Sequence, residues 1–266
     1  MSPPQQRPHG AITTHPREHE GIPHETIEVR TTDGTCNTHL FEPDGQGQHP
    51  GVVMFMDGLG IRPALFDMAA RLAAGGYCVA LPDLYYRSGY VVHDTATLFT
   101  DAVTRADWFA RVMPTVSVAN IMRDMPALLA LLDARPTVRK GSIGTTGYCL
   151  GGKLSLTAAG QFPDRVAASA SYHGVQLATD APDSPHLLAP AMKARIYVGG
   201  ATNDAGFDDA QKQRLEAALT DARVDHTIET YNARHGWVPA DTAAHDPVAA
   251  ERHWETLFAL LKSLPS

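Results

Sequence analysis

The sequence predicts one α/β domain, a mostly parallel central sheet flanked by helices on both faces. Apolar stretches of strand length alternate with helical patterns, and no linker, repeat or low-complexity segment divides the chain. A hydrophobic content of 44% over 266 residues suffices for one sizeable core. We therefore expect a single domain over residues 25–266, preceded by a polar N-terminal extension over residues 1–24 that is poorly ordered or draped on the surface.

The first half of the chain contains an antiparallel pair of strands followed by two buried ones. The four strands are predicted at residues 25–30, 36–41, 51–56 and 77–81. The first two alternate in polarity and are joined by a turn at Asp33-Gly34, whereas the last two are continuously apolar, as strands covered on both faces are. A helical pattern between these apolar strands covers residues 65–72 and ends at Gly75-Gly76.

The second half alternates strands and helices more regularly. Helices are predicted at residues 117–134, 153–159, 212–221 and 247–261, and strands at residues 143–146, 167–172, 195–198 and 225–231. Before them, residues 88–115 form a long aromatic-containing excursion, and the pattern leaves open whether it acts as a lid.

The most informative segment is Gly147-Tyr148-Cys149-Leu150-Gly151-Gly152, which joins a predicted strand to a predicted helix. A residue on such a sharp turn has a strained backbone and an outward side chain, and its neighbours must be glycines to avoid collisions. The first N–H groups of the helix and its dipole favour a thiolate and a developing oxyanion. The segment matches the nucleophile elbow of α/β-hydrolases, with cysteine in place of serine.

An isolated cysteine is more often a buried structural residue than a nucleophile. Cys36 lies in an alternating strand and Cys78 in an apolar one, and neither has a glycine turn or a following helix start. We assign both to packing, and only Cys149 has the setting of a nucleophile.

A nucleophilic thiol needs a base, and the base needs an orienting acid. In α/β-hydrolases these follow in the order nucleophile, acid, histidine, each at the carboxyl end of a strand. Asp204 follows the strand at 195–198 and His235 follows the strand at 225–231, so we predict a triad of Cys149, Asp204 and His235.

Other residues compete for these roles. Asp208 and Asp209 are close to Asp204, but they introduce the next helix and have the position of N-terminal caps. His173 ends a strand but precedes the acid in sequence, which breaks the expected order. His226 and His253 lie inside a predicted strand and a predicted helix, and are more simply exposed or packed.

Composition restricts the class of partner. The formal net charge of −7, from 22 Lys+Arg against 29 Asp+Glu, argues against nucleic acid or an anionic membrane as partner. No apolar run is long enough to span a bilayer, and the N-terminus has no apolar signal-peptide core. Three cysteines without paired spacing indicate a reducing cytoplasm, and thirteen scattered histidines show no metal-binding spacing. We expect no metal, no cofactor and a monomer or small homo-oligomer.

Together these motifs resemble the dienelactone hydrolase family, carboxymethylenebutenolidase-like α/β-hydrolases with a Cys–Asp–His triad. The matching segments are the glycine-flanked Cys149 turn, Gly75-Gly76-Tyr77, Pro82-Asp83-Leu84-Tyr85 and His235-Gly236. The similarity runs from about residue 25 to residue 261.

The resemblance implies a role for each matching residue. Cys149 would attack the ester carbonyl, His235 would relay the proton and Asp204 would hold the imidazole. The backbone N–H groups of Leu150 and Gly58 would form the oxyanion hole, which is worth ~10²–10³ in rate for each donor.

Two positions depart from the family pattern or test it. The family has a glutamate that keeps the resting thiol neutral, and this chain has the shorter Asp57 there, which could equally cap the following loop. Arg87 fits the first of two arginines that hold the carboxylate of dienelactone, but Trp237-Val238-Pro239 replaces the second. The substrate is therefore expected to be a different lactone or a more neutral ester. An apolar pocket is expected from aromatic residues, namely Tyr85, Tyr86, Trp108, Phe207 and Trp237.

The sequence thus predicts a cytoplasmic, cysteine-dependent hydrolase of small-molecule esters or lactones that works through an acyl-enzyme. A general carboxylesterase or thioesterase is the alternative within enzymes. A non-catalytic binding module, with Cys149 as a redox sensor, is the alternative outside them.

Overall fold

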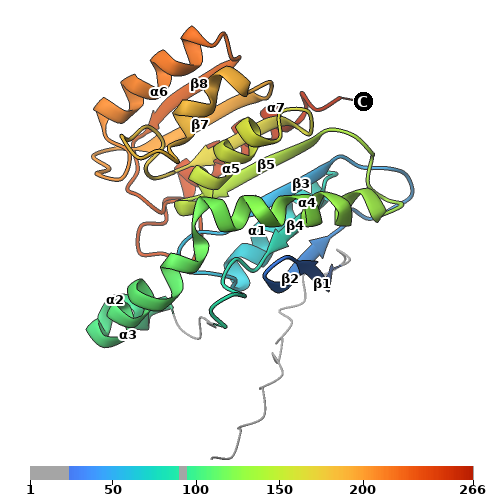
Figure 1. The fold of residues 1–266 in the computed structure, drawn as a ribbon, viewed down its shortest axis with the longest axis horizontal. Helices are drawn as coiled ribbons and strands as arrows, with labels where there is room; N and C mark the ends of the chain where they lie inside the picture. Colours follow the sequence, from blue (N-terminus) through green and yellow to red (C-terminus); the bar gives the residue numbers. More distant parts are fainter. Residues whose placement is uncertain (1–23, 90–94, 266) are drawn as a thin grey trace, which may run out of the picture.

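The computed structural model describes residues 24–89 and 95–265, which are built on one eight-stranded sheet (Figure 1). The strand order is β1-β2-β4-β3-β5-β6-β7-β8. The strands are β1 (His24–Thr31), β2 (Gly34–Phe41), β3 (Gly51–Phe55), β4 (Cys78–Pro82), β5 (Ile143–Tyr148), β6 (Val166–Tyr172), β7 (Arg195–Ala201) and β8 (His226–Tyr231). β2 pairs antiparallel with both β1 and β4, and all other neighbours are parallel. The sequence predicts the antiparallel β1–β2 pair and the mostly parallel sheet, but not the antiparallel pairing of β2 with β4.

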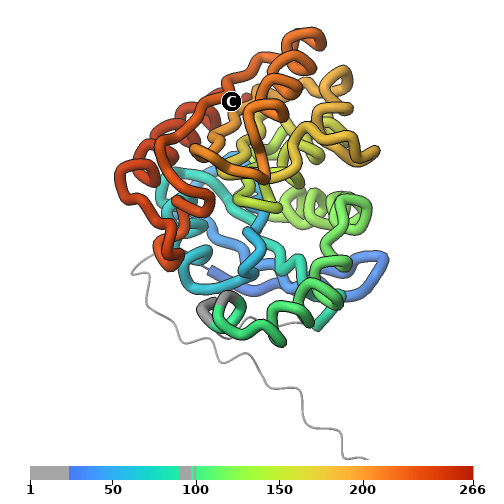
Figure 2. Tube along the Cα trace, turned by 90° about the vertical axis from the view of Figure 1, so that its left-hand side faces the viewer, coloured from blue at the N-terminus to red at the C-terminus, as the bar shows by residue number. Residues whose placement is uncertain are grey.

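The sheet order separates the two halves of the chain. β1 to β4 form one end of the sheet and β5 to β8 the other, and in the side view the blue N-terminal strands lie in the lower part of the molecule and the orange α6 (Asp209–Asp221) at the top (Figure 2). The inner strands β3, β4 and β5 are buried at every residue, which explains why they are continuously apolar or small rather than alternating.

Helices cover both faces of the sheet (Figure 1). On one face, α1 (Pro63–Ala74) and α7 (Pro247–Leu261) lie together, with the Arg71 guanidinium 4.7 Å from the centre of the Trp254 ring. The other face carries α4 (Val118–Ala134), α5 (Leu150–Gln161), α6 (Asp209–Asp221) and the 3₁₀ helix η3 (Pro185–Ala191), which contact one another in the order α4, α5, η3, α6. The α/β architecture is therefore as predicted.

α6 begins earlier than the hydrophobic pattern indicates, because its first turn is polar and capped. The side chain of Asp208 accepts a hydrogen bond from the N–H of Gln211, so α6 begins at Asp209. The side chain of Ser117 accepts from the N–H of Asn120 in the same way at the start of α4. The predicted capping position of Asp208 is thus confirmed.

The excursion at residues 88–115 contains helices that the sequence pattern does not reveal. These are α2 (Thr95–Thr100), α3 (Ala102–Asp107), the π-helix η1 (Trp108–Val112) and the 3₁₀ helix η2 (Met113–Val116). α2 and α3 project from the body of the molecule at one edge (Figure 1). Each is only six residues long, too short for a periodic pattern to be recognised.

The expected N-terminal extension lies outside the described residues except for His24. This residue already belongs to β1, and its ring stacks on Phe41 with 4.3 Å between the ring centroids. The described part of β1 therefore begins at residue 24, one residue before the predicted strand.

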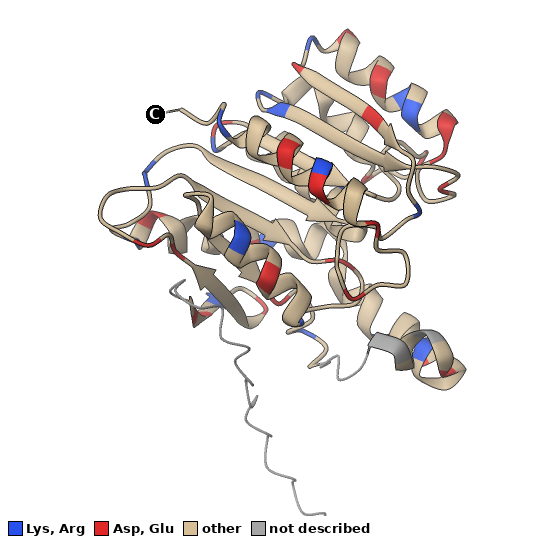
Figure 3. Ribbon diagram, turned by 180° about the vertical axis from the view of Figure 1, so that it is seen from behind, with Lys and Arg blue, Asp and Glu red and all other residues tan. Residues whose placement is uncertain are grey.

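Acidic and basic residues are interspersed along the helices on the face shown in Figure 3. In the described part of the chain, no single helix is long and apolar enough to cross a membrane. Residues 102–116 and 118–134 reach that length and apolarity only as a pair, across a bend of 52°.

One fully buried histidine attaches α7 to the sheet. The Nε2 of His253 lies 3.0 Å from the hydroxyl of Tyr148, and its Nδ1 lies 3.3 Å from the carbonyl oxygen of Ala250. The Nδ1–H can only donate to that carbonyl, so Nε2 accepts from the tyrosine. Burial lowers the pKa of His253 to about 3, so the ring is neutral in the folded protein.

This neutral histidine makes stability depend on pH. Below a pH of about 6.5 the unfolded chain binds a proton at His253 that the folded chain does not, so stability falls as the pH falls. We expect His253→Gln to reduce the loss of unfolding free energy between pH 7 and pH 5 by ~2 kcal/mol. Urea denaturation at both pH values measures it, and equal losses in wild type and variant would contradict the assignment.

Candidate active site

Cys149 occupies a strained turn between β5 and α5. Its backbone has φ 55° and ψ −118°, which a residue with a side chain rarely adopts. The turn also brings backbone segments too close for side chains at its glycines. A Cβ on Gly147 would lie 1.9 Å from the carbonyl oxygen of Gly151, and a Cβ on Gly151 would lie 2.5 Å from that of Met56. The glycines are therefore a steric requirement of this turn, as the sequence predicts.

His173 holds the backbone of this turn from the end of β6. The N–H of Cys149 points at two acceptors, the carbonyl oxygen of Tyr172 and the Nδ1 of His173, each at 3.1 Å. Nδ1 must therefore be unprotonated, and the proton of the ring lies on Nε2. Burial lowers the pKa of His173 well below its usual value, and neighbouring His235 and His253 lower it further. A ring that is 1% exposed and already accepts through Nδ1 is not placed to act as the base.

His235 and Asp204 meet at the carboxyl ends of β8 and β7. The Nδ1 of His235 lies 2.7 Å from Oδ2 of Asp204, and Oδ1 of Asp204 accepts from the N–H of Gly206 at 2.9 Å. The ring of His235 also packs edge-on against that of His173, with 5.1 Å between centroids. His235 is half-buried, with 35% of its side chain exposed, whereas Asp204 is buried.

His235 is hydrogen-bonded to Asp204 and to the side chain of Cys149. Desolvation alone would lower the pKa of His235, but hydrogen bonds to Asp204 and to the Cys149 side chain outweigh it and raise the pKa to about 10. Desolvation likewise acts to raise the pKa of Asp204, yet its hydrogen bond to His235 leaves that pKa below the usual value. The structure thus places a basic imidazole between a thiol and a carboxylate. Asp209, by contrast, is exposed and pairs with Lys212.

Gly58 and Leu150 lie side by side next to Cys149. A Cβ on Gly58 would lie 3.5 Å from Cδ2 of Leu150 and 3.6 Å from ring carbons of Trp108. Leu150 is the first residue of α5, so its N–H has no partner within the helix. The carbonyl oxygen of Gly58 accepts a hydrogen bond of 2.6 Å from the hydroxyl of Tyr85, which fixes the peptide unit after Gly58.

Asp57 does not have the contacts of a thiol-gating carboxylate. Its Oδ1 and Oδ2 accept from Nη1 and Nη2 of Arg62 at 2.6 and 2.8 Å, and Oδ1 also accepts from the N–H of Leu59. Arg62 is 4% exposed, and it also bonds to Asp241. A buried guanidinium thus holds both carboxylate oxygens of Asp57.

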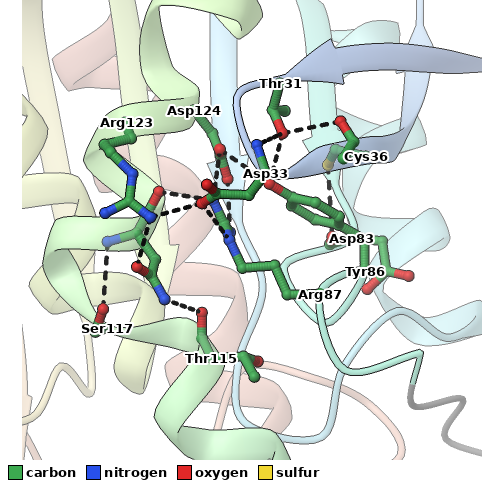
Figure 4. Close-up of polar contacts among 12 residues, drawn as sticks. Thr31, Asp33, Cys36, Asp83, Tyr86, Arg87, Thr115, Ser117, Arg123 and Asp124 are labelled. Atoms are coloured by element: carbon green, nitrogen blue, oxygen red, sulfur yellow. Dashed lines mark hydrogen bonds and ion pairs between the residues drawn. The ribbon is translucent and has the colours of Figure 1, made fainter.

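Arg87 is likewise committed to other residues, which corrects its expected role in substrate binding. Its guanidinium donates to both oxygens of Asp124, to Asp33 and to the carbonyl oxygen of Asn120, at 2.7 to 3.0 Å (Figure 4). These contacts join the turn between β1 and β2 to α4. The hydroxyl of Tyr86 belongs to the same network, since it donates to Asp124.

The predicted aromatic pocket is also corrected, because three of its five members have almost no exposed surface. Trp237 and Phe207 are fully buried and Tyr85 is 1% exposed. Trp237 packs on His173 with 4.9 Å between ring centroids, and so supports the histidine rather than lining an open pocket. Of the predicted aromatic residues, Trp108 lies beside Gly58 and Leu150, and it is 8% exposed.

The other two cysteines have the properties of packing residues, as predicted. Burial raises the pKa of Cys36 to about 12 and that of Cys78 to about 11. Cys149 is partly exposed. No group of three or more metal-ligating side chains occurs among the residues that the structure describes.

Sequence reasoning missed Arg62 and Asp241 and set aside His173. Arg62 lies five residues after Asp57, between a buried strand and a helix, and this spacing could have indicated a buried ion pair. Asp241 is 179 residues from Arg62 and gave no such signal.

Comparison with known proteins assigns this chain to a family. The model of the dienelactone hydrolase family matches residues 36–264. Carboxymethylenebutenolidase of Rhodococcus opacus is 26% identical over 242 residues, which cover 86% of this chain and 87% of that protein.

Solved structures agree on the fold. A crystal structure from Klebsiella pneumoniae subsp. pneumoniae has a TM-score of 0.78 at 21% identity, covering 92% of this chain and 100% of that one. Dienelactone hydrolase from Anabaena variabilis has a TM-score of 0.65 at 17% identity, covering 91% of this chain and 98% of that one. The chain is therefore an α/β-hydrolase, as predicted. More narrowly, it belongs to the dienelactone hydrolase family and is a carboxylic ester hydrolase that acts on esters or lactones.

The three cysteines should differ sharply in reactivity. We expect iodoacetamide at neutral pH to alkylate Cys149 in the folded protein and to leave Cys36 and Cys78 unmodified, because only thiolates react and buried thiols stay protonated. Peptide mapping by mass spectrometry measures it, with urea-unfolded protein as the control in which all three react. Comparable labelling of Cys36 or Cys78 in the folded protein would contradict this view.

Proposed function

We propose that this chain hydrolyses its substrate through an acyl-enzyme on Cys149, with His235 as base and Asp204 as the residue that orients it. The observation that carries the proposal is the coupling of Cys149, His235 and Asp204 on one strained turn and two strand ends. The hydrogen bond of Nδ1 to Asp204 leaves Nε2 of His235 for the thiol. The raised pKa of His235 supports a cationic imidazole, which stabilises a thiolate beside it.

The first half-reaction forms a thioester. The Sγ of Cys149 attacks the carbonyl carbon, and the electron pair of the C=O bond moves to the oxygen, which the N–H groups of Gly58 and Leu150 face. Collapse of this intermediate expels the alkoxide, which takes the proton from His235. For a lactone, the released alcohol stays attached to the acyl group.

The second half-reaction restores the enzyme. Water gives a proton to His235 and attacks the thioester carbon, and the second tetrahedral intermediate expels the thiolate of Cys149. The carboxylic acid then leaves. Asp204 keeps the imidazole in the required tautomer in both halves.

Substitution of the triad tests this mechanism directly. We expect Cys149→Ala to abolish turnover of p-nitrophenyl acetate, and Asp204→Asn to lower kcat by about 10⁴-fold, since the wrong tautomer of His235 is then favoured. Cys36→Ala is the matched control, a buried cysteine outside the site that should leave kcat unchanged. Full turnover in Cys149→Ala would remove the proposed nucleophile.

We further propose that the preferred substrate carries no carboxylate near the scissile bond. Two observations support this: the guanidinium of Arg87 is held by Asp33 and Asp124, and that of Arg62 by Asp57 and Asp241. Arg234, next to His235, is exposed and donates to the carbonyl oxygen of Ala243.

Substrate charge can be tested with matched pairs of esters or lactones. We expect a neutral lactone to have a higher kcat/KM than the same lactone bearing a carboxylate, by about tenfold, because an unpaired carboxylate would lose its hydration without a partner. Preference for the carboxylate that disappears in Arg234→Ala would contradict the proposal and make Arg234 the recognition residue.

Two alternative functions, a general thioesterase and a redox sensor, would give different experimental results. Activity confined to long acyl thioesters would favour the first. Reversible oxidation of Cys149 without turnover would favour the second, since an exposed reactive thiol is readily oxidised.

A further inference from the structure

We infer that Arg62 is a positioning residue that ties the loop of the oxyanion donor Gly58 to the loop of His235. The inference rests on the proposed function, because it concerns the same reaction. It concerns residues that the sequence did not assign to the site, and it gives Asp57 a different role from the one expected.

Arg62 uses its whole guanidinium for this connection. Nη1 donates to Oδ1 of Asp57 at 2.6 Å and to the carbonyl oxygen of Gly60 at 3.0 Å, and Nη2 donates to Oδ2 of Asp57 at 2.8 Å. On the other side, Nε and Nη2 donate to the two oxygens of Asp241 at 2.7 and 3.2 Å. All five donors of a 4% exposed side chain therefore have acceptors, and both carboxylates are bound in a forked geometry.

The Asp57 side of the connection shapes the donor loop. Oδ1 of Asp57 accepts from the N–H of Leu59, and its backbone carbonyl accepts from the N–H of Gly60. Gly58 lies between these bonds, so the direction of its N–H depends on the turn that Asp57 and Arg62 close. Tyr85 completes the turn by donating to the carbonyl oxygen of Gly58.

Asp241 is connected to the His235 loop through its neighbour in sequence, Thr242. The hydroxyl of Thr242 donates to the carbonyl oxygen of Gly236 at 2.7 Å, and Gly236 directly follows His235. His235 itself has separate anchors, the bond to Asp204 and the ring contact with His173. Loss of the connection should therefore release the donor loop while leaving His235 beside Cys149.

This predicts a specific separation between two reactions of the same thiol. Hydrolysis needs the oxyanion donors, whereas alkylation by iodoacetamide needs the thiolate and forms no oxyanion. A defect in the donor loop should lower the first and spare the second. General unfolding of the site would lower both.

The chain offers a closely matched control in the Arg87 network (Figure 4). There too a buried arginine binds a buried aspartate, Asp124, and a second, partly exposed one, Asp33. The side chains of Asp33 and Asp241 are 28% and 34% exposed. The Arg87 network joins the β1–β2 turn to α4, whereas the Arg62 network joins the two active-site loops.

The experiment compares Asp241→Asn with Asp33→Asn in the full chain, using p-nitrophenyl acetate and iodoacetamide. We expect Asp241→Asn to lower kcat by roughly tenfold to a hundredfold, with KM and the alkylation rate of Cys149 within about twofold of wild type. Asp33→Asn should leave all three unchanged, and Tm should shift to a similar extent in both variants. Should Asp241→Asn fail to fold, Arg62→Lys and Arg87→Lys take the places of the two variants, because each keeps the positive charge and loses the forked contacts with its two aspartates.

Two results would overturn the inference. One is a kcat of Asp241→Asn equal to that of Asp33→Asn. The other is a loss of ester turnover in Asp241→Asn that is matched by an equal loss in the alkylation rate of Cys149. Failure of the proposed function itself has a different signature, because ester turnover would then persist in Cys149→Ala whatever the outcome for Asp241→Asn.

Discussion

The strained backbone of Cys149 is the constraint on which the rest of the site depends. A residue held in such a conformation costs on the order of 1–3 kcal/mol, so the surrounding structure must enforce it. β5 and α5 enforce it from the two sides of the turn, and His173 and Tyr172 accept its N–H from the end of β6. The same turn frees the N–H of Leu150 at the start of α5 and directs the thiol toward the histidine loop.

The buried charged side chains around this turn are held in ion pairs. Asp204 faces His235, and Arg62 is held between Asp57 and Asp241. An unpaired ion in this environment would cost several kcal/mol, which is why these groups are paired. The pairing occupies the guanidinium groups of Arg62 and Arg87. A substrate anion would have to displace an existing ion pair to bind either of them, and an uncharged ester or lactone would not.

The order of strands and helices and the three residues proposed as the triad were accessible from the sequence, because glycines and strand ends mark them. Asp204 and His235 follow recognisable strands, and Cys149 stands between glycines whose close contacts the structure explains. The roles of Asp57, Arg87, Tyr85 and Trp237 were not accessible in this way. Each depends on which distant side chain it meets, such as Asp124 for Arg87 or His173 for Trp237. Residue type and spacing indicate that a charge or ring is present, but not the direction in which it points.

The central claim, that Cys149 becomes covalently acylated during turnover, can be measured most directly by acid-quenching the reaction with an activated ester and mapping the modified peptide by mass spectrometry. The account predicts a mass increase of one acyl group on the peptide that contains Cys149, formed and lost at rates compatible with kcat. An acyl group on a different residue, or steady turnover with no acylated peptide, would contradict it.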